Sequence, residues 1–258
     1  MFSDERYNLI LTRLRETDRV TVDDLVDVLS VSKATVRKDL NYLESLGLLV
    51  RTRGGAITQK QFAFAGPSTL SSHRGVHTAE KERIGRAVVG LVRDGDTLMI
   101  DAGTTTLSTA RHLARSDRRL TVITNSIEIA MEMNKPGSSV QVLLAGGLLQ
   151  REDNLLQGPE TEDFLQGLNG DKAIIGAMGL TLKHGLTDPN LSLARVKRLM
   201  VRRCEELVVV LDSSKIGKFA LAPVVPATAI DVLVTDAGID EEARLNLEEA
   251  GVKVVIAD

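Results

Sequence analysis

The feature that most constrains the fold is a series of seven short apolar runs beyond residue 96. Most of the runs are separated by segments of helix length, such as residues 80–92 and 240–249. Short apolar runs that alternate with helices are typical of a mostly parallel β-sheet covered on both faces. We therefore predict an α/β domain over residues 78–258. The expected strands cover residues 97–100, 120–124, 140–145, 173–177, 207–211, 231–235 and 252–257.

Residues 1–57 follow a helical period instead. Apolar residues recur at helical spacing in three segments, which begin near Ser3, Thr21 and Ser32. Thr21 and Ser32 are residue types that cap helix N-termini, and the stretch LLVRTRGGAI that ends at Ile57 reads as a small hairpin. Three helices and a basic hairpin predict a winged helix-turn-helix. Residues 58–77, where Gly, Pro and Ser cluster, are expected to form a linker.

Positive charge is concentrated in this first domain. The whole chain carries a formal charge of −3, which argues against a generic polyanion binder, yet residues 31–60 hold six Lys or Arg and only two Asp or Glu. The third helix would bury an apolar line and expose polar and basic side chains that suit the DNA major groove, while arginines of the hairpin would bind the flanking backbone. The predicted DNA contacts are Ser32, Lys33, Thr35, Arg37, Lys38, Asn41, Arg51 and Arg53.

Two further readings apply to this domain. A solvated amphipathic helix, or a winged helix used for protein contacts, would show the same basic face. Asp39 falls on the buried side of the third helix, so we expect it to form a structural ion pair or a backbone hydrogen bond.

The α/β domain contains a sequence suited to an anion. A predicted strand ends at Ile100-Asp101, then Ala102-Gly103 form a turn and Thr104, Thr105 and Thr106 open a helix. Glycine allows close approach of a ligand to the backbone, and the N–H groups and positive end of a helix favour negative charge. Plain N-capping by threonine would give the same pattern.

Other strand ends carry similar residues. Loops at the carboxyl ends of parallel strands meet at one edge of the sheet, where ligands bind in open α/β folds. We therefore extend the predicted effector site to these loops, with Lys215 of DSSKIG as a cation. The set is Asp101, Gly103, Thr104, Thr105, Thr106, Thr124, Asn125, Ser126, Gly146, Gly147, Gly176, Gly179 and Lys215.

The motifs also resemble a known family. The stretch SVSKATVRKDLNYLESLGLLVRTRGGA, followed in order by EKERIG, IDAGTTT, ITNS, LLAGG, GAMGL, LDSSKIG and LVTDAGID, is similar to the DeoR-type (deoxyribonucleoside-operon repressor) transcription regulators over nearly the whole chain. Lys38 stands where that family usually has a second arginine. The resemblance implies a C-terminal domain similar in fold to ribose-5-phosphate isomerase. It also implies that this domain binds a phosphorylated sugar or a related intermediate as effector.

That likeness raises the question of enzymatic activity. Sugar-phosphate isomerisation needs a carboxylate base and usually a lysine that stabilises an oxyanion. Many relatives carry a glutamate four residues before the lysine that matches Lys197, but here Leu193 occupies that place. The resemblance adds Lys197 to the effector set, while Asp101 and Asp188 remain as candidate bases. We expect binding without turnover and no cofactor; the alternatives are an isomerase tethered to a DNA-binding module and a C-terminal domain that only oligomerises.

Cysteine, histidine and apolar content bear on disulfides, metal sites and location in the cell. A lone Cys204 excludes an internal disulfide, and His73 and His77 lack further ligands, so no metal site is expected. No apolar run approaches the ~18 residues of a membrane span and no leader-like segment precedes the first helix, which predicts a cytoplasmic protein without a membrane partner. The expected partners are double-stranded operator DNA, a sugar phosphate, and further copies of the chain in a homodimer or homotetramer, because paired recognition helices match two half-sites.

Overall fold

The chain divides into two compact units, Met1–Pro67 and Ser68–Asp258. The computed structural model describes residues 3–17, 19–45, 49–52, 54–57 and 73–258. The division falls inside the segment 58–77 that the sequence predicts as a linker. Residues 58–72 of that segment lie outside the described part, whereas residues 73–77 belong to the second unit.

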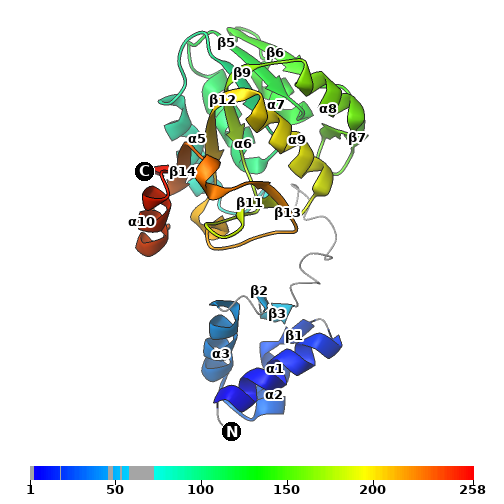
Figure 1. Ribbon diagram of the computed structural model, residues 1–258, viewed down its shortest axis with the longest axis vertical. Coiled ribbons are helices and arrows are strands. Elements are labelled where there is room, and N and C mark those ends of the chain that lie inside the picture. Colours follow the sequence, from blue (N-terminus) through cyan, green and yellow to red (C-terminus); the bar gives the residue numbers. More distant parts are fainter. Residues whose placement is uncertain (1–2, 18, 46–48, 53, 58–72) are drawn as a thin grey trace. The chain divides into compact units, whose positions relative to one another are not determined.

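The first unit is a winged helix-turn-helix, as predicted. Its helices pack around one apolar core that includes Leu25, Val36 and Leu40, and a three-stranded antiparallel sheet in the order β1-β3-β2 completes it (Figure 1). The short first strand is not apparent from the sequence pattern. The elements are α1 (Ser3–Thr17), β1 (Arg19–Thr21), α2 (Val22–Leu29), α3 (Lys33–Ser45), β2 (Val50–Thr52) and β3 (Gly55–Ile57).

Local side chains set the ends of these helices. The Thr21 hydroxyl accepts a hydrogen bond from the Asp24 amide while the Asp24 carboxylate accepts one from the Thr21 amide, which is a capping box. At the start of α3, the Ser32 hydroxyl accepts from the amide of Thr35 at 3.1 Å. Both predicted caps are therefore confirmed. Gly55 is required by packing, because a Cβ at this position would lie 2.0 Å from the carbonyl oxygen of Val20 in β1.

The second unit is built on a seven-stranded parallel sheet in the order β15-β14-β12-β9-β4-β5-β6. All neighbouring strands run parallel, and each corresponds to one of the seven apolar runs. The predicted α/β fold class is thereby confirmed. The strands are β4 (Thr97–Ile100), β5 (Leu120–Thr124), β6 (Val140–Leu144), β9 (Gly170–Ile175), β12 (Cys204–Val210), β14 (Val232–Asp236) and β15 (Lys253–Ala257).

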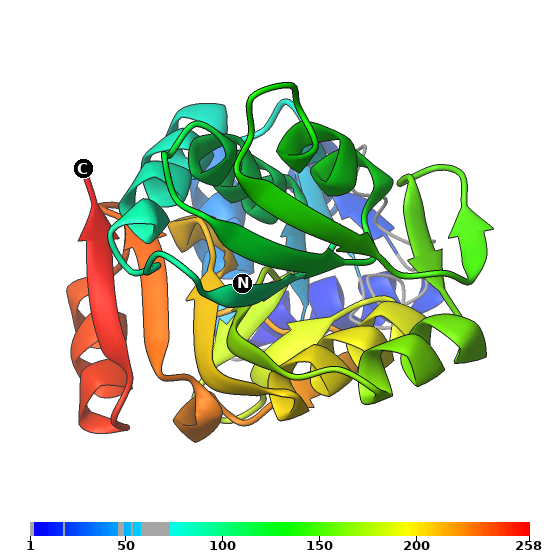
Figure 2. The same cartoon turned by 90° about the horizontal axis from the view of Figure 1, so that it is seen from above.

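Helices cover both faces of this sheet (Figure 2). Buried side chains of α5 (Thr78–Val89), α6 (Thr104–Ala114) and α7 (Ile127–Met133) pack with one set of strand residues. Those of α8 (Pro159–Gln166), α9 (Leu191–Arg202) and α10 (Glu241–Glu249) pack with the other set. Within the described residues, no helix has both the length and the apolar character needed to cross a bilayer.

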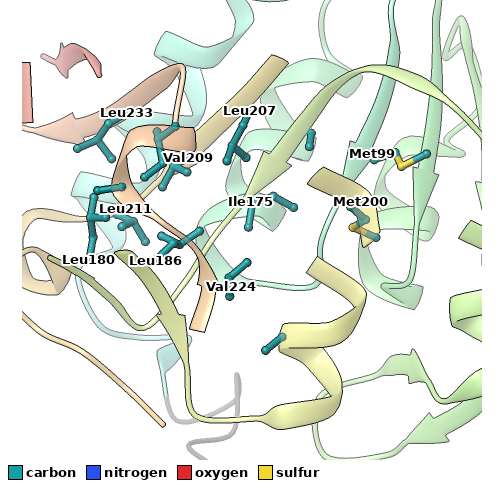
Figure 3. Packing of buried hydrophobic residues seen from close by; sticks show 14 of the residues in the cluster. Met99, Ile175, Leu180, Leu186, Met200, Leu207, Val209, Leu211, Val224 and Leu233 are labelled. Atoms are coloured by element: carbon teal, nitrogen blue, oxygen red, sulfur yellow. The ribbon is translucent and has the colours of Figure 1, made fainter. Parts of the chain in front are cut away.

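Two small sheets that the sequence pattern does not predict complete this unit. One joins β10 (Gly179–Thr181), β11 (Gly185–Asp188) and β13 (Ala222–Val225), and the other pairs β7 (Leu148–Gln150) with β8 (Leu155–Gln157). Figure 3 shows the first of them in the core. Leu180, Leu186 and Val224 lie there with Ile175 and Val209 of the parallel sheet.

The strand order reverses in the middle of the parallel sheet. From β4 the chain moves outward through β5 to β6, and it then returns to place β9 on the opposite side of β4 before continuing to β12, β14 and β15. In open α/β sheets a crevice forms outside the carboxyl ends of the strands at such a switch point. The loops after β4 and β9 are therefore the expected walls of a ligand site.

Candidate functional site

A pocket lies at this switch point. Its lining comes from the segments that follow β4, β9 and β12, from the end of β11, from α9, and from residues near the start of the second unit. The lining residues are His73, Lys81, Ala102, Gly103, Thr104, Thr105, Gly176, Ala177, Met178, Asp188, Lys197, Leu211, Asp212 and Lys215. Six of the predicted effector residues are thus brought together, namely Gly103, Thr104, Thr105, Gly176, Lys197 and Lys215.

The N-terminus of α6 forms one side of the pocket. Gly103 occupies the N-cap position and makes no side-chain cap, so the first-turn amides lack intrahelical acceptors and lie at the positive end of the helix. Thr104 and Thr105 add hydroxyl groups to this wall. Amides and hydroxyls in this arrangement suit the oxygen atoms of an anion.

Thr106 has a different role in the same loop. Its side chain is fully buried and its hydroxyl donates to the carbonyl oxygens of Asp101 at 2.8 Å and of Gly103 at 3.1 Å. Three consecutive residues of a helix point in directions about 100° apart, so one hydroxyl of the three turns inward. Thr106 therefore holds the loop in shape and does not line the pocket.

A buried charge cluster forms the floor. The Lys197 ammonium donates to Asp188 Oδ2 at 2.5 Å and to the carbonyl oxygen of Gly176 at 2.8 Å, and it lies 3.1 Å from Asp101 Oδ2. Asp101, which lies just below the lining, accepts the Gly176 amide through its other oxygen at 2.9 Å. The cluster ties the ends of β4 and β9 to β11 and α9.

The cluster also shifts the pKa values of Lys197 and Asp101. Burial alone would lower the pKa of Lys197, but the attraction of Asp188 and Asp101 outweighs burial and raises that pKa above its ordinary value. Burial raises the pKa of the Asp101 carboxyl, against the attraction of Lys197. Lys197 is therefore a fixed cation, and its donors are directed to groups of the protein.

Three basic side chains, those of His73, Lys81 and Lys215, also line the pocket. Burial lowers the pKa of Lys81, and it also lowers the pKa of Lys215 against the attraction of Asp212. Burial, together with the charges of Lys215 and Lys81, lowers the pKa of His73 to about 4. The positive charges repel one another here, so an anion between them would be stabilised.

Other predicted effector residues lie outside this pocket. Thr124 donates to the carbonyl oxygen of Ile100, Asn125 accepts from the Ala102 amide, and the Ser126 hydroxyl caps α7. Gly146, Gly147 and Gly179 are also absent from the lining, and a Cβ on Gly179 would meet the backbone of Lys218. A direct ligand role for these residues stays a prediction.

Several lining residues were not in the predicted set. They are His73, Lys81, Ala102, Ala177, Met178, Asp188, Leu211 and Asp212. His73 has the appearance of a linker residue, and Lys81 reads as an ordinary helix lysine in EKERIG, so neither carries a local signal. Leu211 and Asp212 could have been found from the sequence, because they lie one and two residues beyond the end of β12 at Val210.

Leu193 faces an apolar cluster. Its side chain is 4% exposed and packs with Ala102 and Leu155 in a small buried cluster beside the α6 loop. Leu193 thus supports the α6 loop through apolar contact with Ala102.

In the first unit, the basic side of α3 is exposed. The solvent-accessible side chains are those of Lys33, Arg37, Lys38 and Asn41. The Lys33 ammonium lies 2.7 Å from Oδ1 of Asp23 in α2. The Ser32 and Thr35 hydroxyls lie 2.9 Å apart at the start of the helix. Arg51 of β2 is half-buried, and Arg53 lies outside the described residues. The role of these side chains in DNA binding stays a prediction.

Asp39 instead holds the domain together. Its carboxylate accepts two hydrogen bonds from the Arg6 guanidinium of α1, at 2.7 and 3.0 Å, and its own side chain is 3% exposed. The predicted structural ion pair is confirmed. This contact fixes α3 against α1 through a two-point geometry that a lysine could not supply.

The chain combines a winged helix-turn-helix, whose basic helix is exposed, with an α/β domain that has a pocket suited to an anion. This combination is typical of ligand-responsive DNA-binding proteins. Family comparisons place the chain within this class. Residues 6–62 match the DeoR-like helix-turn-helix domain, and residues 76–237 match the DeoR C terminal sensor domain. The chain belongs to the DeoR family of transcription regulators.

Curated relatives match along their whole length. The HTH-type transcriptional regulator GlpR of Haloferax volcanii is 35% identical over 256 residues, which cover 99% of this chain and 98% of the relative. The HTH-type transcriptional repressor GlcR of Bacillus subtilis is 33% identical and matches 100% of this chain and 98% of its own. Among solved structures, the sorbitol operon regulator SorC from Klebsiella pneumoniae overlaps 93% of this chain and 98% of its own, at 14% identity and a TM-score of 0.41.

Proposed function

We propose that this protein is a cytoplasmic transcription repressor of a sugar-metabolism operon, and that a phosphorylated sugar or a related intermediate changes its affinity for operator DNA. The winged helix binds the operator, with α3 in the major groove. The α/β domain binds the effector in the pocket at the switch point. The effector changes operator affinity because it favours one arrangement of the paired DNA-binding domains; a coupling of about 1–3 kcal/mol would change affinity about 5–150-fold.

The observation that carries this proposal is the composition of the pocket. An uncapped helix N-terminus, two threonine hydroxyls and the cations Lys81 and Lys215 converge on one space. These groups fit a phosphate, and the carboxylate of Asp188, which also lines the pocket, fits a hydroxyl group of a sugar. Names of relatives point in the same direction, since one is the putative aga operon transcriptional repressor of Escherichia coli O157:H7, 32% identical to this chain.

The operator would be read by the exposed side of α3. Arg37, Lys38 and Asn41 supply donors and acceptors for base edges and phosphates, and Ser32, Lys33 and Thr35 lie at the helix end that approaches DNA first in this class of motif. Arg51 and Arg53 would contact the flanking backbone. A homodimer or homotetramer is proposed because paired recognition helices match half-sites about 34 Å apart or at multiples of that spacing.

Binding without turnover is part of the proposal. The Lys197 ammonium is held by Asp188, Asp101 and Gly176, so its donors are not directed at a bound carbonyl. Leu193 offers an apolar side chain where an isomerase-type base would be needed.

The test is binding of the full-length protein to the DNA upstream of its own gene, at fixed salt, with a panel of pentose and hexose phosphates and the matching unphosphorylated sugars. We expect a specific complex whose affinity one phosphorylated compound changes and its unphosphorylated counterpart does not. Specific DNA binding that no compound alters would contradict the effector site and favour a domain that only oligomerises. Interconversion of a panel compound by the protein would instead favour a tethered isomerase.

A further inference from the structure

Lys81 lines the pocket and also contacts residues 73–76, the entry segment through which the chain enters the second unit. It lies in the first turn of α5 and is 5% exposed. Its ammonium donates to the carbonyl oxygens of His73 at 2.8 Å and of Val76 at 2.6 Å. Residues 73–76 are the first described residues of the unit, immediately after the segment 58–72 that leads from the winged helix along the chain.

The entry segment is a tight turn held largely by polar contacts. The Val76 amide donates to the His73 carbonyl at 3.3 Å, and Arg74 forms an ion pair with Glu128 of α7. His77, at the N-cap of α5, has a φ of +53° and makes no side-chain cap. A non-glycine residue in this left-handed region is uncommon and persists because its surroundings hold it. The two bonds from Lys81 act on both ends of this turn.

Lys81 and His73 also line the pocket, together with Gly103, Thr104 and Thr105 of the α6 loop. A lysine ammonium has three donors. Two of them are directed at the His73 and Val76 carbonyls, so a third remains for an oxygen atom of a ligand. One side chain can therefore bind an anion and the entry segment together.

Electrostatics link the two contacts. Burial lowers the pKa of Lys81, and Lys215 and Lys81 both act to lower the pKa of His73. An anion among these groups would offset the cost of burying the ammonium and so strengthen its charged, donating state. The hold of Lys81 on the entry segment should then become tighter when the pocket is filled.

We propose that Lys81 binds the anionic group of the effector and transmits occupancy of the pocket to residues 73–76, the start of the connection to the winged helix. This inference rests on the proposed function, because it takes the switch-point pocket as the effector site. It adds a ligand-binding residue outside the strand-end loops and a route by which a bound anion orders residues 73–76. The chemistry recognised is that of a phosphate group.

The test is hydrogen exchange of the full-length protein with orthophosphate as the probe, against potassium chloride of equal ionic strength. Local opening that requires an empty site slows by about tenfold at a phosphate concentration near ten times the Kd. Two regions are followed, the amides of residues 73–81 and those of residues 103–107 at the α6 N-terminus. In the unmodified protein, phosphate is expected to slow exchange in both.

Two variants separate the contacts of Lys81. Lys81→Met removes the charge and the donors, and Lys81→Gln keeps an amide donor without the charge. In both, at a phosphate concentration near ten times the variant's own Kd, phosphate is expected to slow exchange at residues 103–107 while the response at residues 73–81 is lost. Lys218→Met is the matched control, because Lys218 is exposed, lies outside the pocket and carries a charge that acts on Lys215.

The exchange pattern tests the role of Lys81 separately from the anion site. An unchanged phosphate response at residues 73–81 in the folded Lys81 variants would overturn the inference and leave the effector site standing. So would protection in the unmodified protein that is confined to residues 103–107. A lack of any protection in the unmodified protein would overturn the anion site of the proposed function itself, and the inference with it.

Discussion

The ammonium of Lys197 lies 2.5 Å from Oδ2 of Asp188, and both residues are almost fully buried. The pair joins α9 to the end of β11 beneath the pocket. Removal of one partner from a buried ion pair costs about 3–5 kcal/mol, because the remaining charge has lost its compensation. Here the carboxylate of Asp188 would lose its partner, and the carboxyl group of Asp101, whose pKa burial raises, would lose the opposing attraction of Lys197.

Lys197→Met is therefore expected to lower the free energy of unfolding of the second unit by about 3–5 kcal/mol. The addition of Asp188→Asn should recover part of that loss, since it removes the carboxylate that Lys197 no longer compensates. The exposed Lys253 supplies the control Lys253→Met. Urea unfolding should be followed by far-ultraviolet circular dichroism, because the chain has no Trp and both tyrosines, Tyr7 and Tyr42, lie in the first unit. Equal midpoints for Lys197→Met and Lys253→Met would contradict this role.

The exposed position of Arg37 leads to a prediction about DNA. Arg37→Ala should weaken operator binding by about 1–3 kcal/mol while the domain stays folded, because the side chain does not contribute to the core of α3. Titration of labelled operator DNA at fixed salt measures the loss. Arg115→Ala, which removes an exposed arginine from the second unit, should leave operator affinity unchanged.

The parallel sheet was predictable because its strands are buried on both faces. Runs such as LVVVL and VKVVIA are nearly continuous in apolar residues. The small sheet β10-β11-β13 gives no such signal. The sequence of β11, GLTD, contains a glycine and an aspartate, and its pairing with β13 depends on residues more than thirty positions away.

The site was predictable only in part, for a related reason. Thr124-Asn125-Ser126 and Thr104-Thr105 are similar residue types at similar strand ends. Which of them faces the pocket depends on the strand order, which places the switch point between β4 and β9 and leaves β5 one strand away. Lys81 and His73 reach the pocket from a preceding segment, so no pattern local to the strand ends reveals them.

The contrast between Thr105 and its neighbour gives a paired prediction. Thr105→Val keeps the shape of the side chain but removes a hydroxyl from the pocket, so it should weaken effector binding and leave operator affinity unchanged. A hydrogen bond to a charged group contributes about 1.5–3 kcal/mol, which is tenfold or more in affinity. Isothermal titration with the effector identified by the DNA-binding panel measures this change.

Thr106→Val should show the opposite profile. Its hydroxyl donates to the Asp101 and Gly103 carbonyls, and loss of a buried donor destabilises by about 1–3 kcal/mol. We expect a lower urea midpoint for this variant, and a smaller loss of effector affinity than Thr105→Val causes once both proteins are folded. Equal effects of the two substitutions on effector binding would remove the distinction between a lining and a supporting threonine.

The low pKa of His73 predicts how stability depends on pH. Its pKa is about 4 in the folded protein, against an ordinary value of 6.5. At pH 7 the imidazole is neutral in the folded state and mostly neutral in the unfolded state, so it contributes little pH dependence there. As the pH falls below 6.5 the unfolded chain takes up a proton that the folded protein does not, and the folded state loses stability until the pH reaches about 4.

His73→Gln removes this titration, so the variant should gain stability relative to the unmodified protein as the pH is lowered from 7 to about 4. The half-buried position of His73 exposes it to solvent screening, so we expect a gain of about 1–2 kcal/mol, less than the full shift would give. Urea unfolding at pH 7 and near pH 4.5 measures the difference. His77→Gln, which removes an exposed imidazole outside the pocket, is the matched control. A difference between His73→Gln and the unmodified protein that stays constant over this range would mean that His73 titrates alike in both states, and that Lys81 and Lys215 do not act on it.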